Sequence, residues 1–538
     1  MVIPSADPAQ PTSPHTIGTV ARMAQRLSNE YWMLIFEQLA PHDLYNVLLT
    51  NRKFYKLALR PLYRFLRFMD LSHFTQNVSF WDNRMDNMAE VPMGMALCAL
   101  TRCRADAPPS YGRMRSEVWT RVTSFPNLQA LEICASSIPG TFYETLHALP
   151  HLKSLSLVDN IFDTVPKDLE AVKDLKELGL THLTLLGNVI LGGRTQGRTR
   201  CHYLHLMTSP TIKVLRVDWE NESSGFLSRT LAGYDGEDFN LPQELQAIEL
   251  CIRINSTSPP VPHEDALQMF FSHCARQVTR LKVVGQLDVY FRLPLELLPN
   301  LEDLGGGAWA THVFLHPSRP IQYLHICDVE NQGRSNYELL YRVSRMKPKL
   351  ELLDIFTSQW DVEVLHAIKQ LFVDLSDLRI KFLRQAPSED VLVSVGSQFL
   401  DGFKNLRSMQ LCRLRSRHLS HVRRYKWYKR HLLASSAART EAPVQEPYSI
   451  PQSLALVKAW NRDCKALREV RLEETHVLRR ASEQDTWSRR PLERPTVTWE
   501  NMEMEAECLL EPREHFEWQF LDVIAETLSA ADMLILTV

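Results

Sequence analysis

The sequence predicts an α/β fold in which an N-terminal module of three short helices precedes a solenoid with parallel strands on its concave face and helices on its convex face. Three observations support this prediction. A short apolar motif with strand-like alternation recurs along most of the chain, and amphipathic stretches of helical length separate its copies. The chain of 538 residues is also longer than one compact domain usually is, as expected for a small module joined to an elongated array.

The N-terminal module is the segment from Leu27 to Leu66. Ser28 is suited to cap a first helix, and Pro41 ends that helix and can open a second. The first helix has one apolar stripe at helical spacing: Tyr31, Leu34, Ile35 and Leu39. The second has an apolar face of Leu44, Val47 and Leu48. A third helix is expected after Asn51, ending at Pro61. About 40 residues cannot bury this much apolar surface among themselves, so the module must dock on the rest of the chain or on a partner.

This segment resembles an F-box, a module that binds a Skp-type adaptor. The matching residues are Leu27, Ile35, Leu39, Pro41, Asp43, Leu44, Leu48, Arg52 and Phe54. The resemblance implies that the adaptor is contacted through Leu27, Ile35, Leu39, Pro41, Leu44, Leu48 and Phe54. It also implies a cullin as the next partner beyond the adaptor. The alternative interpretation is an ordinary helical hairpin that caps a larger domain.

Around this module we expect a disordered tail at 1–20, the F-box-like domain at 21–68 and a connector at 69–122. The tail is rich in proline among small polar residues. The connector has helical potential from Asn87 to Leu100, interrupted at Pro108 and Pro109.

The repeated motif has the form apolar-x-x-apolar-x-apolar, whose second half alternates as a strand with one buried face does. Copies begin at Leu128, Leu152, Leu175, Ile212, Leu245, Val278, Ile321, Leu350, Leu375, Leu406 and Leu467, with a shortened copy at Leu301. The stretches expected to be helical are Phe142–Leu149, His263–Gln277, Asn336–Met346, Val362–Val373, Glu389–Phe403 and Leu454–Cys464. Strand and helix units of this kind stack side by side and bury one another's faces.

Residues 123–538 therefore resemble a leucine-rich-repeat domain in degenerate form, with a large insert at 413–448. Together with the N-terminal module, this is the architecture of F-box/leucine-rich-repeat proteins. The alternative is a general α/β fold whose strands happen to look alike, but the number of copies favours repeats. Two further inserts, Gly187–Arg200 and Glu220–Asn240, are expected to be surface loops.

The search for catalytic chemistry gives no candidate, so we expect neither enzymatic activity nor a cofactor. Gly192–Thr199 has the spacing of a phosphate-binding loop, but Arg198 replaces the lysine and the residues that follow alternate like a strand. We interpret Cys201, His202 and His205 as ordinary strand residues, with no metal site, because no second ligand pair lies at a suitable spacing.

Charge and cysteine content indicate a cytoplasmic or nuclear protein that acts on other proteins. The formal charge of -2 predicts no bulk affinity for nucleic acid or membrane. The cysteines lie mostly in apolar runs without CxxC spacing, which suits reduced, buried thiols. The strongest local charge is basic Arg413–Arg430, which could bind nucleic acid or pair with the acidic Glu500–Glu517; we favour pairing within the chain.

The residues between apolar motif positions should face away from the core, on the concave side of the array. They are Arg216, Asp218, Glu249, Arg253, Lys282, His325, Asp354, Arg379, Lys381, Gln410, Arg471 and Glu473. The mixture of signs suits a protein partner better than a nucleic acid. We expect an acidic or phosphorylated target segment to contact Arg216, Arg253, Lys282, Arg379 and Lys381.

The resulting hypothesis is a substrate-recognition adaptor of a Skp–cullin–F-box ubiquitin ligase, with an unidentified target protein held by the repeats. Two alternatives remain: a protein-binding repeat scaffold without a ligase role, and a nucleic-acid-binding protein that uses 413–430.

Overall fold

The computed structural model divides by its internal contacts into two compact units. Unit 1 comprises Met1–Ser136 with Ala148–Leu152, and unit 2 comprises Ser137–His147 with Lys153–Val538. The structure describes residues 28–37, 54, 65–68, 93–98, 118–125, 127–134, 136–162, 178–190, 202–219, 225, 227, 231, 242–252, 263–274, 276–285, 291–329, 333–347, 349–384, 387–413, 450–472, 476–482 and 486–491.

In unit 1 the first helix is α2, Asn29–Glu37. The backbone N–H of Trp32 donates to the carbonyl of Ser28, as expected where a helix begins at Ser28. Trp32, Phe36 and Phe54 form an aromatic cluster with ring centroids 4.5 to 5.6 Å apart, and Phe36 is fully buried in it. Tyr31 and Ile35 of the predicted stripe are instead 62% and 42% exposed. The buried face of α2 is therefore aromatic, and the predicted stripe faces outward at these two residues.

The strands that the structure describes in unit 1 are β1 (Phe65–Phe68), β2 (Met93–Cys98) and β3 (Leu128–Cys134). They pair in parallel, in the order β1, β2, β3. The expected helical stretch Asn87–Leu100 is wrong where the structure describes it, because β2 is a strand. Met95 and Leu97 alternate with small residues and are fully buried, which is the strand period. The first repeat motif, at Leu128, is confirmed as β3.

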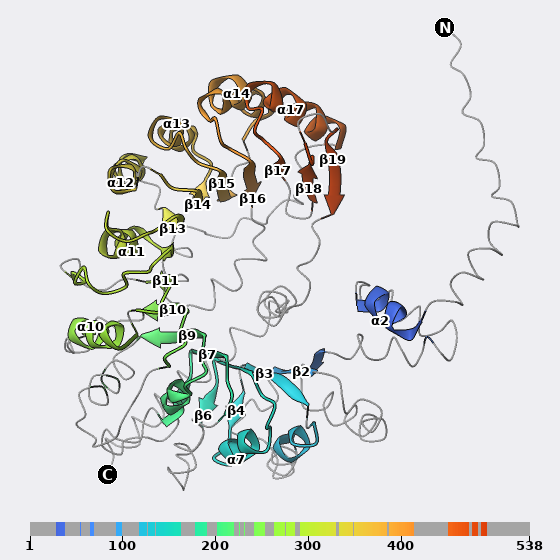
Figure 1. Ribbon diagram of the computed structural model, residues 1–538, viewed down its shortest axis with the longest axis vertical. Helices are drawn as coiled ribbons and strands as arrows, with labels where there is room; N and C mark the ends of the chain where they lie inside the picture. Colours follow the sequence, from blue (N-terminus) through green and yellow to red (C-terminus); the bar gives the residue numbers. More distant parts are fainter. Residues whose placement is uncertain are drawn as a thin grey trace, which may run out of the picture. The chain divides into compact units, whose positions relative to one another are not determined.

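Unit 2 is built on a long sheet whose strands follow one another in chain order (Figure 1). The strands are β5 (Ser154–Val158), β7 (His182–Leu186), β9 (Val214–Trp219), β10 (Ala247–Ile252), β11 (Arg280–Val284), β12 (Asp303–Gly306), β13 (Tyr323–Val329), β14 (Leu352–Gln359), β15 (Asp377–Arg384), β16 (Ser408–Arg413), β17 (Glu469–Arg471), β18 (His476–Arg479) and β19 (Ser488–Pro491). Pairing is parallel from β5 to β17, which confirms a solenoid-like arrangement. The last two pairings, β17 with β18 and β18 with β19, are antiparallel.

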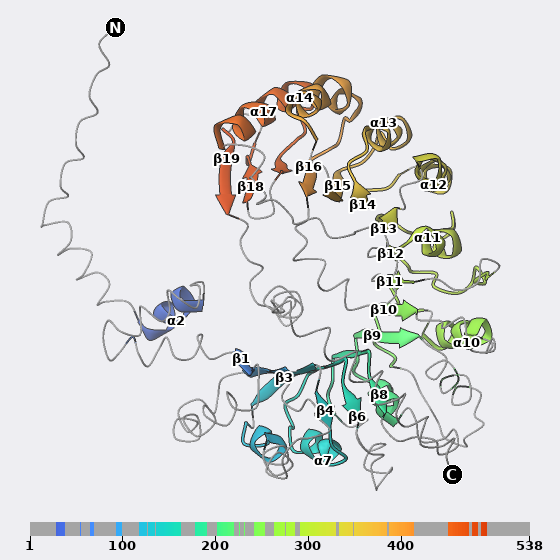
Figure 2. The same ribbon diagram turned by 180° about the vertical axis from the view of Figure 1, so that it is seen from behind.

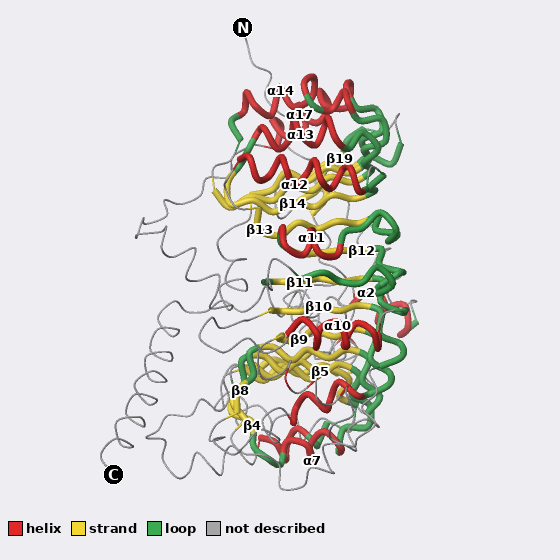
Figure 3. The backbone as a smooth tube through the Cα atoms, turned by 90° about the vertical axis from the view of Figure 1, so that its left-hand side faces the viewer, coloured by secondary structure: helices red, strands yellow, loops and turns green. Residues whose placement is uncertain are grey.

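α-Helices precede β5 and connect several of the later strands on one side of the sheet. They are α7 (Phe142–His147), α10 (His263–Cys274), α11 (Ala308–Phe314), α12 (Gly333–Met346), α13 (Val362–Leu371), α14 (Glu389–Gln398) and α17 (Ile450–Asp463). From α10 to α17 they lie on the outer side of the curve that the strands follow, so the strands line the inner, concave side (Figures 1 and 2). The view from the side shows the strands stacked as successive rungs (Figure 3).

The core of unit 2 lies between the strands and these helices. In the copy that begins at Leu350, the three motif positions Leu350, Leu353 and Ile355 are all buried. Leu365 and Ile368 of α13 are buried as well. Each such side chain contributes roughly 1.5–3 kcal/mol when it leaves water, so the motif itself supplies much of the stability of the array.

At the copy of the motif expected to begin at Leu175, the structure uses a different frame. Residues 175–177 lie outside the described residues, and β7 begins at His182. The motif that the structure uses is Leu180-x-x-Leu183-x-Leu185, whose three leucines are fully buried. Leu178 and Leu180 also fit the spacing of a motif beginning at Leu175, so two overlapping frames were available and the later one forms the strand.

A second, small sheet follows the strand ends of β5 and β7. Its strands are β4 (Ser137–Ile138), β6 (Ile161–Phe162) and β8 (Val189–Ile190). Just before β6 and β8 lie the buried Asn160 and Asn188, 28 residues apart in the chain. Asn188 Oδ1 accepts from Asn160 Nδ2 at 3.2 Å, and Asn188 Nδ2 donates to the Leu157 carbonyl at 2.8 Å. The two asparagines form a ladder that satisfies backbone groups where the strands end.

The insert Gly187–Arg200 was expected to be a surface loop, but its beginning is part of this ladder. Gly187 has φ +65°, and a Cβ atom there would lie against Asp159 Oδ1. Asp159, one step earlier in the array, has a similar φ of 53°. The turn therefore repeats, and glycine allows it at the second position.

His202–Thr208 forms a 3-10 helix, η3, so the expectation of a strand after Cys201 is wrong. His202 is buried, and its Nδ1 lies 2.8 Å from the Tyr143 hydroxyl. Arg198 in place of the lysine still disfavours a phosphate-binding loop at Gly192–Thr199, which lies outside the described residues. The inserts Glu220–Asn240 and 413–448 fall almost entirely outside them, and Glu500–Glu517 does so completely.

Candidate functional site: a charged row on the concave face

The concave face of unit 2 carries one row of side chains that runs straight across the strands. Parallel pairing aligns one residue from each strand, so neighbours in the row are neighbours in space. The row is Ser156, Thr184, Arg216, Glu249, Lys282, Gly305, His325, Asp354, Arg379, Gln410 and Arg471. We call it the polar row. It begins with hydroxyl groups and becomes charged from β9 onward.

The first charged part of the polar row centres on Glu249 of β10. Its carboxylate accepts from Arg216 Nε on β9 and Lys282 Nζ on β11, each at 2.9 Å. Burial alone would raise the pKa of Glu249, but Lys282 and Arg216 outweigh it and lower the pKa to about 2. The same carboxylate raises the pKa of Lys282 to about 12. Three strands are thus linked by one ionised carboxylate.

The second charged part centres on Asp354 of β14. Its Oδ2 lies 2.8 Å from Lys381 Nζ on β15 and 3.1 Å from His325 Nδ1 on β13. Burial alone would raise the pKa of Asp354, but the contacts with His325 and Lys381 lower it. On the other side of the imidazole, His325 Nε2 lies 3.4 Å from Asp303 Oδ1 on β12. Burial raises the pKa of Asp303.

In both charged parts the lysine side chain reaches further into solvent than the acid that holds it. The Lys282 side chain is 46% exposed and that of Glu249 is 14% exposed. Lys381 and Asp354 show the same order, at 29% and 9%. The carboxylates lie low on the face and orient the cationic groups above them. A partner approaching Glu249 or Asp354 therefore meets the tip of Lys282 or Lys381 first.

Four of the five basic residues predicted to bind a target lie on this face. Arg216, Lys282 and Lys381 pair with carboxylates on neighbouring strands, and Arg379 pairs with Asp377 on its own strand at 3.1 Å. Arg253 lies outside the described residues. Their role in target binding stays a prediction.

Four charged residues of the same face were missed: Arg280, Asp303, Asp377 and Glu469. Each lies two residues before a member of the polar row and so points to the same side. The strands begin earlier than the alternating half of the motif, and extending the alternation by two residues would have found these positions.

Of the residues predicted to bind the adaptor, the structure describes two. Ile35 is exposed on α2, and Phe54 belongs to the aromatic cluster with Trp32 and Phe36. Leu27, Leu39, Pro41, Leu44 and Leu48 lie outside the described residues.

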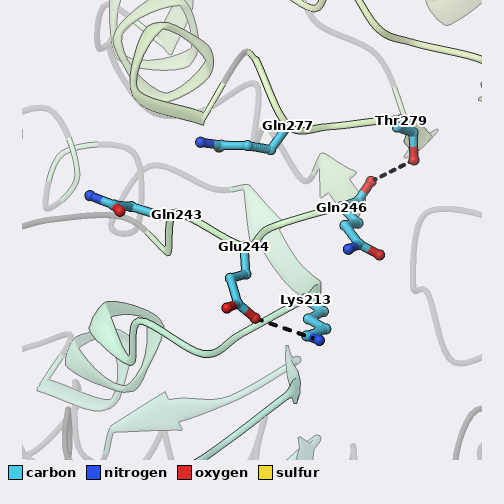
Figure 4. A pocket seen from close by; sticks show the side chains of 6 residues that line it. All are labelled: Lys213, Gln243, Glu244, Gln246, Gln277 and Thr279. Carbon is cyan, nitrogen blue, oxygen red and sulfur yellow. Dashed lines mark hydrogen bonds and ion pairs between the residues drawn. The ribbon is translucent and has the colours of Figure 1, made fainter.

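A shallow, open hollow lies where β9, β10 and β11 begin (Figure 4). Its lining consists of Lys213, Gln243, Glu244, Gln246, Gln277 and Thr279. Lys213 and Glu244 form an ion pair of 3.5 Å, and the Thr279 hydroxyl donates to the Gln246 carbonyl. The lining is polar and wide open to solvent, and it gathers no nucleophile or acid–base pair of the kind that catalysis needs.

The part of the chain that the structure describes contains no cluster of three or more histidine, cysteine, aspartate or glutamate side chains suited to a metal ion. Cys134, Cys251, Cys274, Cys412 and Cys464 are buried there, as expected from the sequence. Within the same residues, no helix combines the length and apolarity that crossing a bilayer requires.

Comparison with known proteins assigns no family. No family model matches the chain, and no curated protein matches it. Among solved structures, a plant peptide hormone receptor, RGFR1 in complex with RGF2, aligns at 12% identity with a TM-score of 0.20, covering 62% of this chain and 53% of the receptor chain. This chain thus spans about half the length of the receptor chain. A likeness at this TM-score carries no inference about fold or function.

The strands, helices and polar row by themselves define the class. Unit 2 is a mixed α/β, solenoid-like repeat array with a long parallel sheet, and its concave face is lined by ordered ion pairs.

Proposed function

We propose that this chain is a protein-binding repeat scaffold that captures its partner on the concave face of β9–β16. The observation that carries the proposal is the polar row, in which the largely buried carboxylates of Glu249 and Asp354 hold the more exposed side chains of Lys282 and of Lys381, two residues after Arg379. Such a surface is preorganised, because its cations need not be ordered when the partner binds. The expected partner surface is an acidic or phosphorylated protein segment.

The test removes two exposed charges and keeps their aliphatic stems. Lys282→Met with Lys381→Met in the full chain should lower the amount of partner protein captured from cell extract at least tenfold by quantitative mass spectrometry. Lys213→Met is the matched control, because Lys213 is also 46% exposed and also pairs with a glutamate. Equal capture by all three proteins would contradict the proposal.

The finer proposal is that the scaffold delivers its partner to a Skp–cullin–F-box ubiquitin ligase. It is supported by the F-box resemblance of Leu27–Leu66 and by the outward-facing Tyr31 and Ile35 on α2, which leave apolar surface for an adaptor. The mechanism is proximity: tethering raises the effective concentration of target lysines beside a ubiquitin carrier held by other subunits. No residue of this chain takes part in the chemistry.

The adaptor proposal is tested by a charge on the outer face of α2. Ile35→Asp should abolish co-purification of a Skp-type adaptor, because an uncompensated charge would enter an apolar interface. Val393→Asp on α14 is the control, since Val393 is another exposed apolar residue, 60% exposed. Leu44→Asp gives a second variant in the same module. If the adaptor co-purifies unchanged with both Ile35→Asp and Leu44→Asp, the chain is a scaffold without a ligase role.

A further inference from the structure

The charges on the concave face between β9 and β15 fall into three zones of alternating sign. On β9–β11 three bases (Arg216, Arg280 and Lys282) face two acids (Asp218 and Glu249), which leaves a net charge of +1. On β12–β14 the described side chains of this face include Asp303 and Asp354 and no lysine or arginine, which leaves −2 with His325 uncharged. On β15 two bases (Arg379 and Lys381) face Asp377, which leaves +1.

We propose that this pattern selects a partner segment with the complementary order acidic, basic, acidic. The inference rests on the proposed function and specifies the partner of the same face. An acidic side chain at each end meets Lys282 on one side and Lys381 on the other, and a basic side chain between them meets Asp303.

The spacing of the segment follows from the sheet. Lys282 is on β11 and Lys381 is on β15, four strand steps away. At ~4.8 Å per step the two strands are ~19 Å apart, which a polyproline II helix at ~3.1 Å per residue spans in about six residues. The middle zone lies halfway, about three residues from either acid. A peptide of the form Glu-x-x-Lys-x-x-Glu has this geometry in the polyproline II conformation, because three residues per turn place all three charged side chains on one side of the peptide.

The member of the polar row on β12 is Gly305, which contributes no side chain between Lys282 and His325. A Cβ atom at Gly305 would lie 3.2 Å from Lys282 Cγ and 3.7 Å from His325 Cβ, so these two side chains already close over the glycine. The side chain of Asp303, on the same strand, is 30% exposed and is the accessible acid of the middle zone.

The central carboxylates have the chemistry to bind a cation. Asp303 pairs with His325 at 3.4 Å, a longer contact than the 2.8 Å between Asp354 and Lys381. Burial raises the pKa of Asp303 because it disfavours the ionised carboxylate. A positive charge from the partner beside Asp303 would stabilise that ionised form. A third acidic residue in the middle of the partner segment would meet like charge and weaken binding.

The experiment compares two peptides of identical composition on the full chain. Fluorescently labelled Gly-Ser peptides that contain Glu-x-x-Lys-x-x-Glu and Lys-x-x-Glu-x-x-Glu are titrated at one salt concentration, and binding is followed by fluorescence polarisation. The first peptide should bind at least tenfold more tightly, because only its order places all three charges against opposite charges. Equal affinities, a preference for the second peptide, or no saturable binding of either peptide would overturn the inference.

Two variants locate the effect. Asp303→Asn with Asp354→Asn should reduce the preference to less than threefold, because the middle zone loses its charge. Asp401→Asn, on the helical side of the array in an ion pair with Lys369, should leave the preference unchanged. A preference that survives the first variant would place recognition elsewhere. If the peptides fail while Lys282→Met with Lys381→Met still abolishes partner capture, the scaffold function stands and only the three-zone pattern is wrong.

Discussion

The first and the later repeats of unit 2 stabilise the ends of their strands in different ways. After β5 and β7 the chain turns through Asp159 or Gly187, and the ladder of Asn160 and Asn188 satisfies the backbone before two-residue strands follow. From β10 onward, helices such as α10, α13 and α14 return the chain instead. The polar row changes along the same direction, from Ser156 and Thr184 to ion pairs. The contrast shows that one strand motif can support two kinds of outer layer and two kinds of inner face.

The largest effect is expected in the helix-backed repeats. Trp460 of α17 is fully buried, and its Nε1 donates to the Leu392 carbonyl of α14 at 2.8 Å. Trp460→Ala should cost about 3–5 kcal/mol through the cavity it leaves. Because each repeat contacts mainly its neighbours, amide hydrogen exchange should quicken around α14, α17 and β16 and stay unchanged in β5 and β7.

Val393→Ala is the control for this variant, since Val393 is exposed on α14. Faster exchange in β5 and β7 of Trp460→Ala would show that unit 2 unfolds as one cooperative body. The two kinds of repeat would then not differ in local stability.

The second effect concerns the ionic part of the polar row and its pH dependence. The pKa of Glu249 is lowered from 4.5 to about 2, so its contribution is complete above pH 4.5 and is lost as the pH falls from there toward 2. The lowered pKa corresponds to roughly 3 kcal/mol. Glu249→Gln should lower the free energy of urea unfolding by this amount at pH 7, and the difference from the unmodified chain should shrink as the pH falls below 4.5.

Glu244→Gln provides the comparison, because Glu244 is 58% exposed in its pair with Lys213. An exposed pair contributes at most about 1 kcal/mol. If the two variants behave alike at pH 7, the ion pairs of the polar row do not stabilise the sheet.

The smallest effect is expected at the asparagine ladder. Asn188→Ala removes the hydrogen-bond partner of Asn160 and of the Leu157 carbonyl, and a buried unsatisfied group costs about 1–3 kcal/mol. Hydrogen exchange should quicken in β6 and β8 and stay unchanged from β11 onward. Asn300→Ala, whose amide donates to the Arg276 carbonyl at an exposed site, should have little effect. If both substitutions had an equal effect, the asparagine ladder would stabilise the first repeats no more than an exposed hydrogen bond does.

The sequence predicted the strands of the array well because their core positions repeat. Ile212, Leu215 and Val217, for example, are fully buried as the motif requires. The alternation also placed Arg216, Lys282, Arg379 and Lys381 on one face. The alternation gave the wrong result where two frames of the motif overlap, because Leu178 and Leu180 fit both. In the wrong frame, Asn188 and Asn160 do not occupy equivalent positions.

Other differences have local causes. The segment around Met95 has weak helical periodicity in the sequence, and pairing with β1 and β3 makes it a strand. Leu204 and Leu206 alternate with polar residues, yet the segment forms the 3-10 helix η3 and buries both leucines. The ion pairs of the polar row could not be read from the sequence, because they depend on the register between strands more than 25 residues apart.

The change of strand direction after β17 limits how such an array can grow. A further repeat would need a parallel neighbour, but β18 pairs antiparallel with β17 and β19 pairs antiparallel with β18. That edge ends at Pro491, which has no N–H to offer another strand. At this end of the sheet, added copies of the motif can therefore be accommodated between existing parallel strands, by insertion or duplication within the array. A designer who wished to lengthen the binding face would have to open it in the middle, for instance between β15 and β16, and leave the β17–β19 end intact.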